Sequence, residues 1–540
     1  MQFLRILWPI LLGTLFTTVQ GARRNAKRQT NLSQFVSTSG SQFIVNGRRF
    51  VGANAPWLPT LLTKDDIKNT LCNMSDAGIK VVRTWGFNDV TEIPENKNQT
   101  WFQLINKDGT VMINNGTNGL QKLDLVLEAA HECNILVIIS LTNNWNPIAN
   151  STTSSEISDN TRPRNTLSND FGGMDTYIRQ FGGSKHDEFY TNATLLAAFQ
   201  NYTTQIVTRY VNNPTVFSWW IANDPRCNSS VEASPSCKST TVTQWHSTIG
   251  QHIKSMDPNH IVSSGNQGFF CMGCQKLFTP TPPPPAPQVS AAPGVRRRRA
   301  TKPQFLTKRK LMKLREERRR MNRALSGGDV SGVRVRGRWV ATRTRRQEED
   351  EVGSAFDGSA GVDSEDIMNI PEIGYSTFQF FPDQNTYIQG PADSGLSSFQ
   401  NVLQEGLDWI QLQAELSSTS GKPVALTAFG LVSQEHAPDF VPFNTTVAPF
   451  AANSQGTTLS LNNSTFGVTG AQRNQAYSAW LDAGITSGLA GIMQYQWGVT
   501  NVTAAQGTSF SPNEDSTSAS PDETGTSSSP DDGYSIIDSK

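Results

Sequence analysis

The sequence predicts an α/β fold, a closed (β/α)8 TIM barrel interrupted by a disordered basic insertion. The chain has 540 residues, whereas one such barrel needs roughly 250. Short runs rich in β-branched residues alternate with amphipathic stretches, which is typical of parallel βα units. Eight such runs are present. This number matches a closed barrel, whose functional side chains gather at the C-terminal ends of the strands.

The expected elements follow from these runs. The predicted strands are 50–54, 81–84, 136–141, 216–222, 260–264, 377–381, 424–428 and 491–495. The predicted helices are 64–77, 120–133, 195–210, 242–256, 396–416 and 472–483. Together they give the alternating order that a parallel barrel requires.

The N-terminal stretch predicts secretion. Residues 6–16 are apolar but form too short a run to span a membrane. They follow a basic residue and precede small residues, as in a signal peptide. We therefore predict a signal peptide at 1–22 and, because a dibasic pair follows, a propeptide at 23–28. This leaves 29–540 as the mature chain; the alternative is a buried N-terminal helix.

Glycosylation sequons agree with an extracellular location. Asn-x-Ser/Thr motifs recur along the whole chain and mark a secreted glycoprotein. They lie at Asn31, Asn73, Asn98, Asn115, Asn150, Asn192, Asn201, Asn228, Asn444, Asn463 and Asn501.

Six cysteines in a secreted chain permit three disulfides. Two pairs are close in sequence and predict local loop staples, and the remaining two cysteines lie on separate predicted helices. In that order the pairs are Cys227 with Cys237, Cys271 with Cys274, and Cys72 with Cys133. Free buried thiols are the alternative for the last pair.

Charge is unevenly distributed, although the formal net charge is zero. Residues 276–346 hold 21 of the 46 Lys and Arg and 3 of the 46 Asp and Glu. This leaves 25 basic and 43 acidic residues elsewhere, a net charge of −18 against +18 within the segment. The acidic body gives no reason to expect a nucleic-acid partner.

The basic run lies in a segment, 275–358, that we predict to be a disordered insertion. It begins proline-rich and continues with arginine clusters, from which no packed core can be built. A helix is allowed over 308–325, but its apolar stripe is interrupted by Arg318 and is too thin to dock firmly on a core. The segment 503–532, rich in Ser, Thr, Asp and Pro, is predicted to be a second, flexible loop.

Three interpretations of the basic segment are open. It is a solvated insertion, a binder of acidic surface polymers, or an intron translated by mistake. The third is favoured, because the barrel pattern resumes cleanly and the charge balance switches abruptly at both edges. Sequencing the messenger RNA across codons 275–358 would decide between them.

Ordered motifs across the chain carry a family resemblance. They are VGANAPWL at 51–58, VVRTWGFND at 81–89, NGLQKLD at 118–124, NNW at 143–145, FGGMDTYI at 171–178, EFYTN at 188–192, WWIANDPRC at 219–227 and SGNQGFF at 264–270. The chain resembles the fungal endo-β-1,4-mannanases of glycoside hydrolase family 5 over 35–274 and 359–500, and the Asp-Gly-Tyr at 532–534 is also similar. The resemblance implies a glycosidase that uses two carboxylates.

The chain departs from the family at both catalytic positions, at the ends of the fourth and seventh strands. Asp224 stands in the acid/base position, and its carboxylate is set back by about one bond length, which weakens proton transfer. Ala428 stands in the nucleophile position and cannot form a covalent intermediate. The nearest acidic residue after it, Glu435, is seven positions further on in a predicted loop.

Neighbouring positions that the resemblance assigns to the substrate are changed as well. Gln379 stands where the family has histidine, Phe381 where it has tyrosine, and Tyr495 where it has tryptophan. At 219–220 and 266–267, carboxylates of the family are replaced by amide or apolar side chains.

Other positions match the family. Arg83 corresponds to the arginine that supports the nucleophile, and Asn223 to the asparagine that binds the sugar 2-hydroxyl. Pairing with a structural carboxylate is the alternative role for Arg83. Trp57, Trp85 and Trp145 lie beside strand ends and offer stacking faces for sugar rings, although core packing is the commoner fate of tryptophan.

The sequence thus predicts a secreted protein of endo-β-1,4-mannanase type that acts on or binds β-1,4-mannan, with hydrolysis severely impaired. The alternatives are a non-catalytic mannan-binding protein or the product of a faulty gene model. The expected partner is β-1,4-mannan or a related plant cell-wall polysaccharide, bound by a monomer without cofactor or metal and without a membrane or nucleic-acid partner. The histidines show no metal-ligand spacing; they are His131, His186, His246, His252, His260 and His436.

Overall fold

The computed structural model describes residues 34–44, 49–147, 168–280, 305–325, 332–335, 338–341, 353–385, 387, 396–437, 440, 467–503, 526–529 and 531–537. The predicted signal peptide and propeptide lie outside these described residues. Among the helices of the described ranges, none combines the length and the apolar character needed to cross a bilayer.

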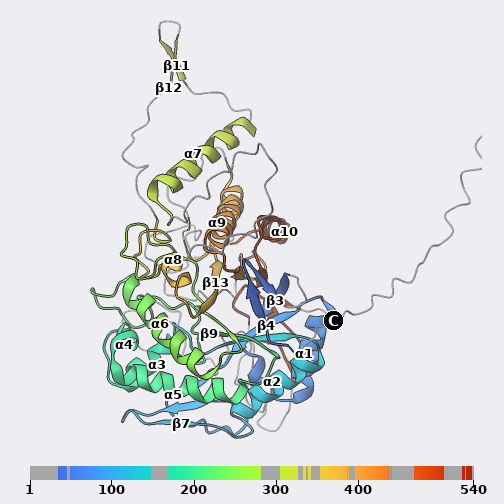
Figure 1. Ribbon diagram of the computed structural model, residues 1–540. Coiled ribbons are helices and arrows are strands. Elements are labelled where there is room, and N and C mark those ends of the chain that lie inside the picture. The colour runs from blue at the N-terminus through green and yellow to red at the C-terminus, as the bar shows by residue number, and fades with distance from the viewer. Residues whose placement is uncertain are drawn as a thin grey trace, which may run out of the picture.

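Parallel strands form a closed barrel in chain order (Figure 1). They are β3 (Phe50–Asn54), β4 (Val81–Trp85), β8 (Leu136–Ser140), β9 (Val216–Trp220), β10 (Ile261–Ser263), β13 (Ile373–Phe380), β14 (Val424–Phe429) and β15 (Gly491–Gln494). The pairing of β15 with β3 closes the ring. Each corresponds to a predicted strand, so the predicted fold class is confirmed. Strands covered on both faces have near-continuous apolar sequences, which is why the runs were visible.

Helices surround the barrel. They are η1 (Leu58–Thr60), α1 (Lys64–Asp76), α2 (Leu120–Glu132), α3 (Met174–Gln180), α4 (Glu188–Thr191), α5 (Ala193–Tyr210), α6 (Ser239–Met256), α8 (Ser364–Met368), α9 (Ser398–Ser420) and α10 (Gly470–Ser487). The predicted helices are all among them. Capping boxes at Ser397 and Thr469 begin α9 and α10, because each hydroxyl accepts a backbone N–H that the helix leaves unpaired.

The N-terminal end of the barrel is closed by a hairpin of β1 (Ser37–Ser39) and β2 (Gln42–Ile44). Phe43 is buried. Its ring centroid lies 5.0 Å from those of Phe217 and Tyr375, in edge-on contact with both. This aromatic core fills one end of the barrel, which leaves the opposite, C-terminal end for a ligand.

Short strands form small sheets outside the barrel. They are β5 (Asp89–Val90), β6 (Gln103–Ile105), β7 (Val111–Ile113), β11 (Gly332–Val335), β12 (Arg338–Ala341), β16 (Trp497–Gly498), β17 (Val502–Thr503), β18 (Thr526–Ser527) and β19 (Ile536–Ile537). The hairpin β11–β12 projects away from the barrel (Figure 1).

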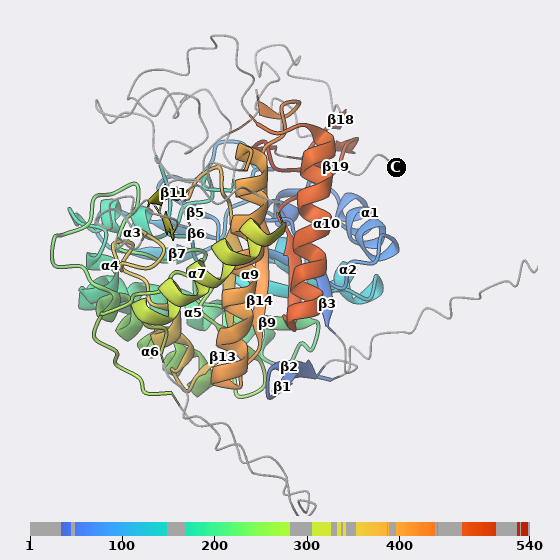
Figure 2. The same ribbon diagram turned by 90° about the horizontal axis from the view of Figure 1, so that it is seen from above.

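The prediction that the helix within the basic segment docks too weakly is wrong. Helix α7 (Lys308–Leu325) runs across α9 (Figure 2). Leu306 just before it and Leu311 in its first turn are buried in the main core. The Lys310 ammonium lies 2.7 Å from the Glu415 carboxylate on α9. A thin stripe is enough here, because only the start of the helix packs against the barrel.

Both edges of the predicted insertion belong to the packed body. Lys276 forms an ion pair with Asp363, and the backbone amide of Leu277 donates to Asp366 at 2.9 Å. At the other edge, Phe356 is buried and its ring stacks on Phe270 with a centroid distance of 5.9 Å. The boundaries 275 and 358 are therefore too wide. Residues 281–304 and 342–352 lie outside the described part of the chain.

The second predicted loop also has ordered edges. Strand β17 at its start pairs with β18 near its end, and the backbone amide of Ser529 donates to the Val499 carbonyl at 2.8 Å. Asp532 is buried. Residues 504–525 lie outside the described ranges.

All six cysteines are paired as predicted. The disulfides join Cys72 with Cys133, Cys227 with Cys237, and Cys271 with Cys274. The first ties α1 to the end of α2, and the second closes the loop that follows β9. The alternative of free thiols at the first pair is therefore wrong.

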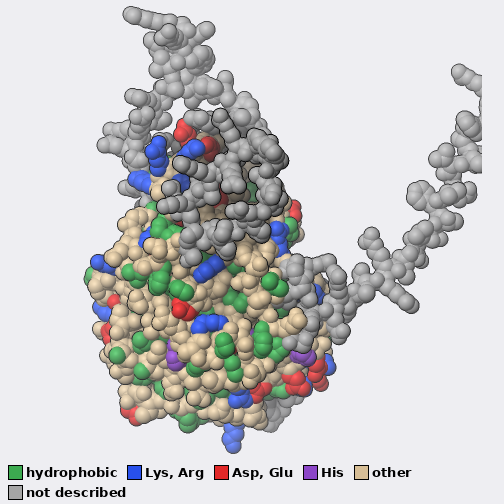
Figure 3. Space-filling view, viewed as in Figure 1, with side chains coloured by type: hydrophobic (Ala, Val, Ile, Leu, Met, Phe, Trp, Pro, Cys, Tyr) green, Lys and Arg blue, Asp and Glu red, His purple; other side chains and the backbone are tan. Residues whose placement is uncertain are grey.

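Figure 3 shows how charged groups lie on one face of the protein. On the face shown in Figure 3, Lys, Arg, Asp and Glu side chains lie singly among polar and hydrophobic ones over the barrel, with a group of basic residues near α7. That group includes the exposed Lys308, Arg309 and Lys310.

Candidate functional site

The predicted site residues meet at the C-terminal ends of the barrel strands. Arg83 lies on β4, Asn223 and Asp224 follow β9, and Ala428 lies on β14. Gln379 on β13 pairs in register with Ala428. The barrel topology thus brings together residues that are far apart in sequence, as the fold prediction requires.

Asp224 is held by donors on every side. Its Oδ1 accepts from Arg226 Nε at 2.8 Å, and its Oδ2 accepts from Arg226 Nη2 at 2.7 Å. Trp145 Nε1 donates to Oδ2 at 2.9 Å, and Gln267 Nε2 donates to it at 3.1 Å. The side chains of Asp224 and Arg226 are 4% and 8% exposed. A forked arginine–carboxylate pair of this kind is a strong, orienting interaction.

The backbone of Asp224 contributes to this arrangement. Its φ is +55°, a left-handed conformation that aspartate tolerates better than most residues but that still carries strain. Its amide donates to the Gly265 carbonyl at 3.0 Å. The side chain therefore turns back toward Arg226, two residues on, in place of reaching across the barrel mouth.

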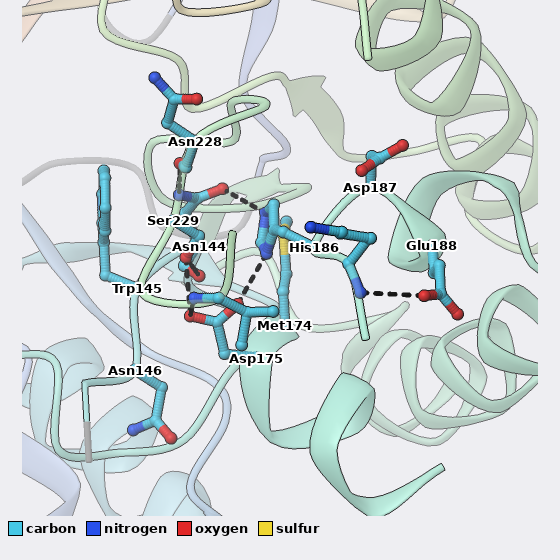
Figure 4. Close-up of polar contacts among 12 residues, drawn as sticks. Asn144, Trp145, Asn146, Met174, Asp175, His186, Asp187, Glu188, Asn228 and Ser229 are labelled. Carbon is cyan, nitrogen blue, oxygen red and sulfur yellow. Dashed lines mark hydrogen bonds and ion pairs between the residues drawn. The ribbon is translucent and has the colours of Figure 1, made fainter. Parts of the chain in front are cut away.

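A buried polar network supports this side of the site (Figure 4). His186 Nδ1 lies 2.7 Å from Asp175 Oδ1, and Ser229 Oγ donates to Asp175 Oδ2 at 2.7 Å. His186 Nε2 lies 3.0 Å from the side-chain oxygen of Asn144. Asn144 precedes Trp145, so the network fixes the segment that carries the indole bonded to Asp224.

Arg83 is buried, with 2% of its surface exposed. Its Nε donates to Asn54 Oδ1, and its Nη1 donates to Asn223 Oδ1 at 2.8 Å. The guanidinium carbon lies 5.0 Å from the ring centroid of Trp85 and 4.4 Å from that of Trp220, both in cation–π range. Burial lowers the pKa of Arg83 to about 9. No ion pair of Arg83 is found among the described residues, so the alternative of a structural carboxylate partner is not supported there.

The nucleophile position lies in an apolar cluster. Ala428 is fully buried against Phe381, Val432, Tyr495 and Tyr534. The ring of Phe381 lies 5.4 Å from that of Tyr495 and 5.3 Å from that of Tyr534. We call these five residues the aromatic plug. Through this plug Tyr534, which is near the C-terminus, packs close to the end of β14.

A glycine makes room for this plug. A Cβ added at Gly430 would lie 2.4 Å from a ring carbon of Tyr534, which no side chain allows without a shift of the ring. The Asp-Gly-Tyr motif at 532–534 thus has a structural role beside the site.

Two buried carboxyl groups beside the plug were missed at the sequence level. Asp383 Oδ2 accepts from the Val432 amide at 2.9 Å, and Asp532 Oδ2 accepts from the Tyr495 hydroxyl at 2.7 Å. Burial raises the pKa of each to about 7. Glu435, the acidic residue considered from sequence, is exposed in the loop after β14. No periodic pattern marks an aspartate in a loop as buried, and the one sequence signal for this pair was the Asp-Gly-Tyr motif at 532–534, which includes Asp532.

The predicted stacking tryptophans show little open surface. Trp57 is 1% exposed, Trp85 2% and Trp145 4%. Trp85 Nε1 donates to the Ser168 carbonyl at 3.0 Å, and the Arg226 guanidinium carbon lies 5.3 Å from the Trp145 ring centroid. In this structure the three indoles therefore pack as core residues, and those of Trp85 and Trp145 also donate hydrogen bonds to protein oxygens.

The remaining substituted positions serve as internal links. Trp219 Nε1 donates to Asp257 at 2.7 Å, and Trp220 Nε1 donates to the Tyr375 hydroxyl at 2.8 Å. Gln379 Nε2 donates to Asn223 Oδ1 at 3.4 Å. Trp220, which stands where the family has a carboxylate, and Gln379, which stands where it has histidine, thus form hydrogen bonds within the barrel.

The fold is a (β/α)8 barrel, and the predicted site residues lie at its C-terminal end, where proteins of this fold bind their ligands. Residues 33–281 match the family described as GH family 5 beta-mannosidase-like. The chain is 37% identical over 242 residues to mannan endo-1,4-β-mannosidase F of Aspergillus clavatus, covering 44% of this chain and 48% of that protein. It is 35% identical over 238 residues to mannan endo-1,4-β-mannosidase A of Hypocrea jecorina, covering 44% and 47%.

Solved structures agree on the fold. The endo-1,4-β-mannanase from Rhizomucor miehei has a TM-score of 0.56 at 23% identity, covering 94% of this chain and 95% of that one. The hyperthermostable endo-1,4-β-D-mannanase from Thermotoga petrophila RKU-1 has a TM-score of 0.51 at 22% identity, covering 91% and 96%.

The resemblance to glycoside hydrolase family 5 is thereby confirmed over residues 33–281, a stretch that is similar in sequence to mannan endo-1,4-β-mannosidases. The chain spans about half the length of the curated relatives that it matches. The matched part includes Asp224 and Arg83 and ends before Ala428.

Proposed function

We propose that this protein is a secreted, monomeric member of the mannanase family that binds β-1,4-mannan without cleaving it by double displacement. The observation that carries the proposal is that neither catalytic position offers the chemistry required. Asp224 accepts two hydrogen bonds from Arg226 and others from Trp145 and Gln267, and Ala428 has only a methyl group within the aromatic plug.

The residue at the acid/base position is not available for proton transfer. A general acid must present its proton within hydrogen-bond reach of the leaving oxygen. The carboxylate oxygens of Asp224 accept hydrogen bonds from protein donors, and the residue is only 3% exposed. An aspartate paired in this way stabilises the loop after β9; it does not point a proton at a substrate.

The covalent step is lost independently. A retaining glycosidase forms a bond between a carboxylate and the anomeric carbon, with the two carboxyl groups about 5–5.5 Å apart. Ala428 supplies no such group. Asp383 and Asp532 near it each accept a hydrogen bond within the protein, and their raised pKa values favour the neutral form, which is a poor nucleophile.

The proposal of mannan binding is supported by polar groups at the barrel mouth and by the similarity to enzymes that are named for mannan. Asn223 is only partly buried, and it is oriented by Arg83 and by Asn143, whose oxygen accepts from Asn223 Nδ2 at 2.9 Å. An oriented amide at the mouth suits a sugar hydroxyl, which both donates and accepts.

Secretion is supported by the three disulfides, since such bonds persist in oxidising compartments. The N-terminal apolar stretch and the sequons point the same way. Mass spectrometry of the protein from culture medium should find Gln29 at its N-terminus; recovery only from cell extracts with Met1 intact would overturn this part of the proposal.

Titration calorimetry with mannohexaose tests binding, with cellohexaose as the competing glycan. Asn223→Ala should weaken mannohexaose binding about fivefold, the value of one hydrogen bond. Asn259→Ala is the matched control, because Asn259 is exposed at the opposite end of the barrel, just before β10, and should leave the affinity unchanged. Absence of binding at millimolar mannohexaose, or equal loss in both variants, would contradict the proposal.

A further inference from the structure

Arg83 is a buried cation that has no carboxylate partner among the described residues. Its hydrogen bonds go to the amide oxygens of Asn54 and Asn223, and two tryptophan rings flank it. Dipoles and ring faces stabilise a desolvated charge less than an anion does, and burying an unpaired ion costs several kcal/mol. The lowered pKa of Arg83 has desolvation as its largest cause. The site therefore favours any anion that reaches it.

Hydrogen bonds link Arg83 through its partners to the neighbours of Ala428. Asn54, which binds Arg83, also donates through Nδ2 to the carbonyl of Thr427 at 3.0 Å. Asn223, which binds the other edge of the guanidinium, accepts from Gln379, and Gln379 is the register partner of Ala428. The guanidinium and the Ala428 methyl thus lie on one layer at the barrel mouth.

Arg83 is buried, but one of its two hydrogen bonds lies nearer to the surface than the other. Its hydrogen bond to Asn54 is buried, whereas its hydrogen bond to Asn223 is only partly buried. Asn223 itself is partly exposed. An anion that approaches along Asn223 would meet the Nη1 edge of the guanidinium first.

We propose that Arg83, Asn223, Gln379 and the methyl group of Ala428 form a binding site for a carboxylate ligand. A planar monoanion matches the fork of the guanidinium through two parallel hydrogen bonds. Because Arg83 is 2% exposed, the ligand that we expect is a small carboxylate such as formate or acetate, and the carboxylate of a hexuronic acid is the second source of the same group. The site does not depend on mannan binding, so either proposal can fail alone.

Thermal unfolding of the whole protein in sodium formate, at ionic strength held constant with sodium chloride, tests the site. Because a ligand that binds only the folded state stabilises it, formate should raise Tm in a saturable way, by roughly 2–5 °C. Formamide, which is uncharged and nearly the same size, should give no rise. Sodium glucuronate in the same titration separates the sources: a rise with formate alone assigns a free anion, and a larger rise with glucuronate assigns a sugar-borne one.

Variants at position 428 sharpen the test. Ala428→Glu adds a carboxylate beside Arg83, so its Tm should exceed that of Ala428→Gln, the uncharged control of equal size, and its response to formate should vanish. Calorimetric titration of the unaltered protein with formate keeps the test decisive if neither variant folds. A formate response no larger than that of chloride, or one undiminished in Ala428→Glu, would overturn the proposal.

Discussion

The two sides of the barrel mouth differ in what stands at the two positions that the resemblance makes catalytic. On the acid/base side, the carboxylate is present but bound: Asp224 is fixed by Arg226, Trp145 and Gln267. On the nucleophile side, the carboxylate is absent, and Ala428 lies in the aromatic plug with Tyr534. One side is polar and hydrogen-bonded within the protein, whereas the other combines the aromatic plug with two buried carboxyl groups, Asp383 and Asp532.

Under the proposed function, the acid/base position is inactive because its carboxylate is paired, and the nucleophile position is inactive because its carboxylate is replaced. Restoring Glu at position 428 leaves Asp224 bound to Arg226. Restoring Glu at 224 leaves no nucleophile. The Asp224–Arg226 pair stabilises the polar side, so substitutions there should lower the free energy of unfolding of the whole barrel. Substitutions on the other side should change mainly the pH dependence of that free energy.

The largest effect on stability is expected from Arg226→Met, which leaves Asp224 as an unpaired buried charge. Its free energy of unfolding should fall by about 3–5 kcal/mol, measured by urea denaturation. Arg209→Met is the matched control, because its ion pair with Asp124 is 29% and 39% exposed and such pairs contribute about 1 kcal/mol or less. Equal losses in the two variants would show that the Asp224–Arg226 pair contributes no more to stability than an exposed pair, which would contradict this description of the polar side.

The apolar side should reveal itself through pH. The pKa values of Asp383 and Asp532 rise from 3.8 to about 7, so between these values the folded protein holds protons that the unfolded chain has released. Raising the pH from about 4 to 7 should therefore lower the free energy of unfolding, with little further change above.

Asp532→Asn isolates this effect, because asparagine is an uncharged isostere. At pH 8 the variant should be more stable than the unaltered protein, by on the order of 3 kcal/mol, and the two should converge near pH 4. Denaturation curves at both pH values supply the measurement. A variant that is less stable at pH 8 would place the ionised carboxylate among the stabilising groups.

A smaller effect on stability is expected when one hydrogen bond to each of the carboxyl groups of Asp224 and Asp532 is removed. Trp145→Phe removes a donor from a charged acceptor, whereas Tyr495→Phe removes one from a carboxyl that is neutral at pH 5. The first should cost about 1.5–3 kcal/mol and the second about 0.5–1.5 kcal/mol. Trp85→Phe, whose indole donates to a backbone carbonyl, corrects for the packing lost with an indole. Equal losses at pH 5 would mean that the two sides carry the same charge.

Most of the fold was predictable from sequence, whereas much of the site was not. The barrel strands are confirmed because strands buried on both faces read as apolar runs. The pairing of Asp224 with Arg226 depends on a left-handed backbone conformation at position 224, which no sequence pattern predicts. The aromatic plug depends on Tyr534, more than a hundred residues after Ala428.

Burial also changed the interpretation of aromatic and apolar residues. Trp57, Trp85 and Trp145 were expected to offer faces to sugars, because they follow strand ends. Sequence gives position along the chain, whereas exposure depends on what packs above each ring. The same reason accounts for α7, where Leu311 finds a place in the core although its helix is strongly basic.

The most direct test of the account is reducing-sugar release from galactomannan by the purified protein. The quadruple variant Asp224→Glu, Ala428→Glu, Gln379→His and Phe381→Tyr is measured alongside, together with Ala428→Glu alone. The unaltered protein should release no more sugar than a heat-inactivated sample, the single variant little more, and the quadruple variant measurably more. Turnover of the unaltered protein within about tenfold of an ordinary mannanase would contradict the account; abolition of that turnover by Asp532→Asn or Asp383→Asn would identify the substitute nucleophile.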